Sequence, residues 1–122
     1  MGLVIPDAAG RLILGAALLP YLYFAGRDLR LHLTARRVPL AESVLHIALA
    51  IPLLASIGLA FQFRAREAAL GMALFAVFGA ADEYVFHRGI PAEEHDVHAK
   101  EHYALFVFLA VFGALVQLRA AP

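Results

Sequence analysis

Apolar residues occur along this chain in four long runs, separated by three short polar segments. A helix that crosses a bilayer needs about 20 mostly apolar residues, and each run is close to that length. The runs predict transmembrane helices over about residues 8–26, 38–63, 68–87 and 91–118. They are too long for strands, and they lack the alternation that membrane barrels require. We therefore expect an all-α integral membrane protein.

The segments between these runs are short, and short links place successive helices antiparallel. The predicted architecture is an up-down-up-down bundle of four transmembrane helices that forms a single domain over residues 1–122. Pro39 and Pro91 are placed to open the second and fourth helices, where a missing N–H costs nothing. Gly89 is placed to cap the third helix at its C-terminus.

Composition supports a membrane protein and excludes some functions. Hydrophobic residues make up 62% of the chain, whereas a soluble domain has about half. The formal net charge is zero, so the basic patch needed for a nucleic-acid partner is missing. The chain has no cysteine, which excludes disulfides and thiolate metal ligands. We expect the lipid bilayer as its main partner and leave a homo-oligomer open.

A polar island, residues 82–102 (DEYVFHRGIPAEEHDVHAKEH), interrupts the apolar pattern. It holds four of the six histidines and six of the ten acidic residues. Ionisable groups inside a membrane are costly unless they bind something, so the island predicts a functional site. In the predicted topology all six histidines lie on one side of the membrane. Six basic residues on that side against four on the other favour a cytoplasmic location, in a bacterial-type inner or plasma membrane.

Acidic residues precede histidines by four positions at four places in the chain. Residues four apart share a helix face, so each pair can direct a carboxylate and an imidazole to the same point. The pairs are Asp28/His32, Glu42/His46, Glu83/His87 and Glu94/His98. On the fourth predicted helix, His95, His98 and His102 form one narrow stripe. The first pair lies nearest the polar connector, where we expect headgroup or solvent contact.

These groups lie at similar depths in the predicted helices, which indicates a shared metal site. The expected ligands are Glu42, His46, Glu83, His87, His95, His98 and His102. The residues expected to hydrogen-bond the ligands are Asp82, Glu94, Glu101, His32, Tyr84 and Tyr103. Imidazole and carboxylate ligands without sulfur suit iron, zinc, manganese or copper(II). The inventory is large enough for two ions; we prefer iron and place zinc second.

Asp82 adds an electrostatic argument for a bound cation. Asp82 and Glu83 fall near the C-terminal end of a predicted helix, where the helix dipole disfavours anions. A divalent metal would compensate two such charges. The role of Asp82 stays open between metal ligand, hydrogen-bond partner of a ligand, and ion-pair partner of Arg88.

The motif E-Y-V-F-H (residues 83–87), followed by H-D-V-H (residues 95–98) and His102, resembles a reduced form of the histidine boxes of membrane di-iron hydroxylases and desaturases, the fatty-acid and carotenoid hydroxylase type. Those boxes read H-x-x-x-H and H-x-x-H-H. Here Glu83 and Ala99 stand where that family has histidine. The resemblance implies a metal-dependent oxidoreductase with two irons, acting with dioxygen on a hydrophobic substrate.

Three other functions are compatible with the same residues. A zinc-dependent membrane hydrolase would use a metal-bound water as its nucleophile. Haem binding through two axial histidines would leave the paired acids unexplained. A non-enzymatic protein that senses or transports metal or dioxygen would also use a carboxylate–imidazole site. The sequence does not assign catalytic residues among these possibilities.

Overall fold

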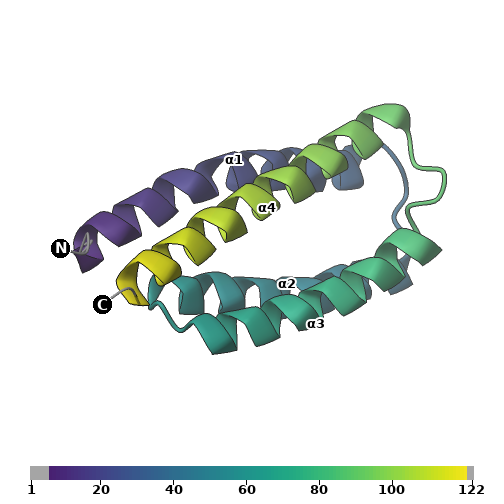
Figure 1. The fold of residues 1–122 in the computed structure, drawn as a ribbon. Helices are drawn as coiled ribbons and strands as arrows, with labels where there is room; N and C mark the ends of the chain where they lie inside the picture. The colour runs from purple at the N-terminus through teal and green to yellow at the C-terminus, as the bar shows by residue number, and fades with distance from the viewer. Residues whose placement is uncertain (1–5, 121–122) are drawn as a thin grey trace. The chain divides into compact units, whose positions relative to one another are not determined.

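The computed structural model describes residues 6–120 and contains four α-helices joined by short segments (Figure 1). The helices are α1 (Asp7–Thr34), α2 (Leu40–Phe61), α3 (Ala65–Val85) and α4 (Ala92–Ala120). Each is long and apolar enough to cross a membrane. No strand occurs between residues 6 and 120. The predicted fold class, an all-α integral membrane bundle of four transmembrane helices, is confirmed.

Two helix ends differ from the prediction in ways that affect the polar residues. α1 continues to Thr34 instead of ending near residue 26, because its extension is rich in leucine and arginine, which are good helix formers. Asp28 and His32 are therefore helical. α3 ends at Val85 rather than at residue 87, so His87 lies in the segment that links α3 to α4. Gly89 has a φ of 131° and turns this link, three residues beyond the α3 cap.

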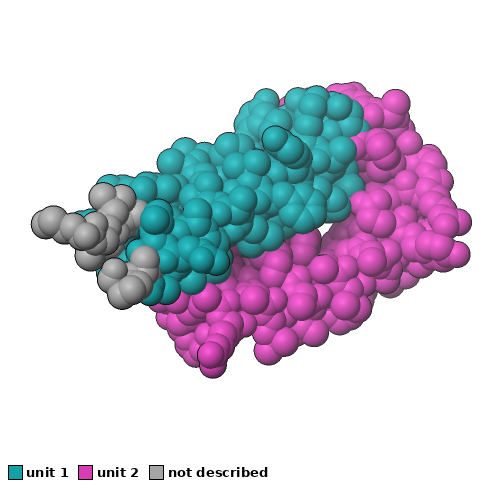
Figure 2. All heavy atoms as spheres, viewed as in Figure 1, with its two compact units in different colours: residues 1–29, 96–122 teal, residues 30–95 magenta. Residues whose placement is uncertain are grey.

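The chain divides into two compact units, coloured separately in Figure 2. Unit 1 contains residues 1–29 and 96–122, and unit 2 contains residues 30–95. In unit 1, α1 and α4 run antiparallel, since Arg119 pairs with Asp7 and His98 lies 3.4 Å from Asp28. In unit 2, α2 and α3 form an antiparallel hairpin (Figure 1). The single domain expected from the sequence stays a prediction.

The two helices of the unit 2 hairpin approach each other at small residues, and several of their larger apolar side chains are exposed. A Cβ on Gly71 would lie 2.2 Å from Ser56 Oγ and 3.2 Å from the Pro52 carbonyl oxygen, so α3 approaches α2 closely at this glycine. Leu54, on the side of α2 opposite Ser56, is 66% exposed. Lipid accommodates such a face, whereas water would not.

Replacement of Gly71 by alanine should destabilise the hairpin by about 1–3 kcal/mol, because the added methyl group overpacks the contact with α2. Thermal unfolding in detergent, followed by circular dichroism, measures the effect. The matched control is Gly58→Ala, since a Cβ on Gly58 meets nothing within 4 Å. An unchanged midpoint for Gly71→Ala would mean that the two helices separate there at little cost.

Candidate metal centre

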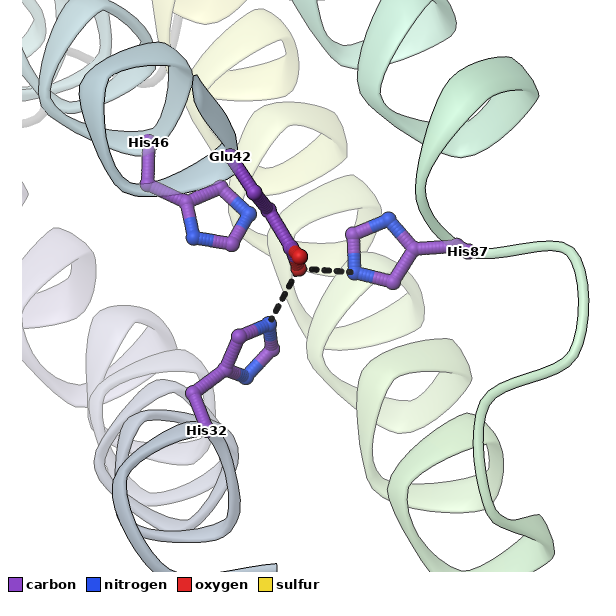
Figure 3. Close-up of side chains that lie close together, drawn as sticks. All are labelled: His32, Glu42, His46 and His87. Atoms are coloured by element: carbon purple, nitrogen blue, oxygen red, sulfur yellow. Dashed lines mark ion pairs between the residues drawn. The ribbon is translucent and has the colours of Figure 1, made fainter. Parts of the chain in front are cut away.

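Four side chains of unit 2 converge on one point, and we call them the unit 2 centre: His32, Glu42, His46 and His87 (Figure 3). One potential ligand atom from each lies within 4.8 Å of the others. Glu42 and His46 stand one turn apart on α2, as their spacing predicts. His32 reaches them from the last turn of α1, and His87 from the link after α3.

The carboxylate of Glu42 lies among the three imidazoles. Glu42 is 1% exposed, and its Oε1 lies 3.6 Å from Nε2 of His32 and 4.0 Å from Nε2 of His87, as the dashed lines in Figure 3 mark. The ring of His46 packs against that of His32, with centroids 4.8 Å apart. Three imidazoles and a buried carboxylate therefore share one small volume.

Asp82 on α3 holds two of these imidazoles in place. Its Oδ2 lies 3.0 Å from Nε2 of His46 and 3.1 Å from Nδ1 of His87. The His46 nitrogen donates its N–H to Asp82, because an ionised carboxylate only accepts hydrogen bonds, and the His87 nitrogen lies at ion-pair distance from the same oxygen. The second nitrogen of His87, Nε2, faces Glu42. This is the arrangement in which a carboxylate orients metal-binding histidines.

Arg36, in the link between α1 and α2, joins two buried glutamates. Its guanidinium donates to both carboxylate oxygens of Glu42, one of them at 2.8 Å, and its Nε lies 3.1 Å from Oε1 of Glu94. Glu94, in the first turn of α4, is fully buried, and His32 Nε2 lies 3.5 Å from its Oε1. The hydrogen bond to Glu42 raises the pKa of Arg36 above its usual range.

Negative charge exceeds positive charge around the unit 2 centre. Glu42, Asp82 and Glu94 are each no more than 3% exposed, and Arg36 supplies one positive charge to this group. With neutral imidazoles the balance is two negative charges. Buried charges are stable only when they are compensated. A divalent cation bound to the imidazoles would bring this net charge to zero, and so would two protons on the imidazoles.

The structure brings together part of the predicted site. Glu42, His46 and His87, expected as ligands, meet as predicted, and Asp82 contacts two of them. His32 was expected to contact headgroups or to hydrogen-bond the ligands, but it lies within the centre. Its spacing of four from Asp28 was the available signal. Sequence reasoning gave no role at this site to Arg36, which carries no motif.

The other predicted site residues lie at the edge of the unit 2 centre or outside it, and the nearest of them, Glu83, has a carboxylate oxygen within 4.8 Å of a ring nitrogen of His87. The side chains of Glu83, His95, Tyr84 and Tyr103 are exposed, and the Arg88 guanidinium sits 4.0 Å from the centroid of the Tyr84 ring. Arg88 thus pairs with Tyr84, and Asp82 pairs with histidines instead. His98, His102 and Glu101 belong to unit 1. Their participation in one shared site stays a prediction.

The donor set of the unit 2 centre, three imidazoles and one carboxylate without sulfur, suits zinc, iron, manganese or copper(II). Four ligands are the number that a single tetrahedral ion takes. Comparison of the chain with family models, with curated proteins and with solved structures finds no match. Its function must therefore be argued from the geometry of the site.

Arg36→Gln should destabilise the metal-free protein by about 3 kcal/mol, because it leaves Glu42 and Glu94 buried without their cation. Thermal unfolding of protein stripped of metal with a chelator measures this loss. Arg37→Gln is the matched control, since Arg37 is exposed. Adding Glu94→Gln to Arg36→Gln should recover part of the loss; a double variant less stable than either single variant would contradict this coupling.

Proposed function

We propose that this chain is a membrane metalloprotein that binds iron at the unit 2 centre and carries out oxidative chemistry on a hydrophobic substrate. The observation that supports it best is the convergence of His32, Glu42, His46 and His87 beside three buried carboxylates to which Arg36 supplies one positive charge. Bound iron would supply one-electron and dioxygen chemistry that protein side chains lack. The resemblance of residues 83–102 to histidine boxes favours this chemistry over hydrolysis.

Each residue has a defined task in this proposal. Glu42 and the three histidines would hold the ion, and Asp82 hydrogen-bonds His46 and contacts His87, which orients the two rings. Arg36 stays with Glu94 and shares the Glu42 carboxylate, whose oxygens each have more than one lone pair. This sharing keeps the net charge close to zero once the ion is bound.

A second iron would need more ligands than the four of the unit 2 centre. Asp82 is the nearest further carboxylate, because its Oδ2 lies 3.0 Å from His46 and 3.1 Å from His87. Its Oδ1 is buried and accepts no hydrogen bond from any residue between 6 and 120. Glu94 touches the centre at His32, and Glu83 comes within 4.8 Å of His87. These three carboxylates are therefore the ones that a two-iron form would recruit.

An apolar groove between α2 and α3 supports the proposal that the substrate is hydrophobic. It is lined by Ala48, Ile51, Pro52, Ala55, Leu59, Glu67, Leu70, Gly71, Leu74 and Phe78. Along the helices, Ala48 follows His46 by two residues and Phe78 precedes Asp82 by one turn. The groove thus begins near the level of the unit 2 centre. An acyl or isoprenoid chain from the bilayer has the shape and polarity to lie in it.

The membrane side belongs to the same proposal. The helix links that carry Arg36 and His87 lie at the end of the bundle with the excess of basic residues, which favours a cytoplasmic position in a bacterial-type inner membrane. A cytoplasmic centre would have access to intracellular reductants.

Protein purified in detergent without chelator should contain iron in a fixed ratio to the chain, together with a visible absorption band. Glu42→Gln and His46→Ala should each reduce that content at least tenfold, because each removes a ligand. Mass spectrometry of the metals measures it. Glu93→Gln, which changes an exposed glutamate, should leave the content unchanged. Zinc without a visible band would replace the proposal of oxidative chemistry with one of hydrolysis, and the absence of any metal would refute both proposals.

Asp82→Asn should weaken metal binding about 10–100-fold while the four ligands remain, because an amide orients the two imidazoles less well than a carboxylate does. Competition with a chromophoric chelator gives the dissociation constant. Asp82→Glu is expected to retain more affinity than Asp82→Asn. Equal affinity of Asp82→Asn and the unaltered protein would show that Asp82 pairs with these rings only in the metal-free form.

A further inference from the structure

Unit 1 contains a second group of convergent ligand atoms, built from the two antiparallel helices α1 and α4. Asp28 belongs to α1, and His98 and Glu101 belong to consecutive turns of α4. Nδ1 of His98 lies 3.4 Å from Oδ2 of Asp28 and 3.9 Å from Oε2 of Glu101. One ligand atom from each of the three lies within 4.8 Å of the others. We call these residues the unit 1 triad.

The unit 1 triad is largely shielded from solvent. The side chains of Asp28, His98 and Glu101 are 11%, 14% and 15% exposed. The buried hydroxyl of Tyr21, two turns before Asp28 on α1, hydrogen-bonds Glu101. The ring of His102 packs beside that of His98, with centroids 4.4 Å apart. Tyr21 thus fixes one carboxylate, and two imidazoles line the α4 side.

Two carboxylates this close repel each other, and low exposure strengthens the repulsion. An imidazolium at His98 would offset one of the two charges. A divalent cation would offset both and would also explain why oxygen, nitrogen and oxygen atoms from two helices meet at a single point. We propose that the unit 1 triad is a second metal site, which takes a divalent first-row cation with a preference for oxygen ligands, manganese(II) or iron(II).

Ligand chemistry separates this site from the unit 2 centre. The unit 1 triad offers two carboxylates and one imidazole, whereas the unit 2 centre offers one carboxylate and three imidazoles. Carboxylate-rich sites suit manganese relatively better, and imidazole-rich sites suit zinc and copper. All three triad residues lie in unit 1, so the inference does not depend on the proposed function of the unit 2 centre.

Titration of the detergent-purified full chain with manganese(II) tests the site, because bound manganese loses the six-line electron paramagnetic resonance signal of the free ion. The unaltered protein should bind manganese(II), and Asp28→Asn and Glu101→Gln should each weaken binding at least tenfold. Asp96→Asn is the matched control: its carboxylate is also on α4 of unit 1 but is exposed and paired with Lys100. This control should bind as the unaltered protein does.

Glu42→Gln distinguishes failure of this site from failure of the unit 2 centre. Manganese binding that survives Glu42→Gln and is lost in Asp28→Asn supports the triad, whatever the iron content proves to be. Binding lost in Glu42→Gln and kept in Asp28→Asn would overturn it, and so would an absence of bound manganese. Far-ultraviolet circular dichroism verifies folding. If Asp28→Asn does not fold, His98→Gln takes its place, and unchanged binding in that variant overturns the proposal.

Discussion

The buried carboxylate of Glu42 sets the main constraint on unit 2. A carboxylate removed from water and left uncompensated would cost several kcal/mol, more than most single contacts return. Glu94 and Asp82 add two more buried carboxylates within contact of the same histidines. The α1–α2 link brings Arg36 to Glu42 and Glu94, and the link after α3 brings His87 to Asp82. The helix ends and their links are therefore held where positive charge and imidazole can reach these oxygens.

The remaining length of the helices places this polar chemistry at one end of the hairpin. Beyond Leu49, the faces of α2 and α3 that meet are built from small and apolar residues, with Ser56 satisfied by the Pro52 carbonyl oxygen. Their outward faces are apolar as well. Such a scaffold tolerates lipid on all its exposed surface, because its backbone is satisfied within the helices. It also keeps the carboxylates away from the middle of the spans.

The sequence predicted the helices and one face of the site better than it predicted the partners of each residue. The length of an apolar run is nearly sufficient to predict a membrane-spanning helix. A spacing of four residues places Glu42 and His46 on one face of such a helix. The spacing does not determine which neighbouring helix that face meets. The spacing therefore could not predict that these histidines belong to two different groups. His98 and Glu101 lie beside Asp28, whereas His87 lies beside Asp82. Arg36 lies in a link without periodicity, so its contact with Glu42 followed from no pattern.

The two acid–histidine pairs that α1 and α4 carry are matched crosswise. Asp28 of α1 meets His98 of α4 in unit 1, and His32 of α1 meets Glu94 of α4 in unit 2. The helices are antiparallel, and each carries its acid one turn before its histidine. A slip of one helical turn in either direction would therefore place acid against acid or histidine against histidine. Only the observed register matches unlike groups at both levels, so the same side chains that form the candidate sites also fix how far α1 and α4 can slide along each other.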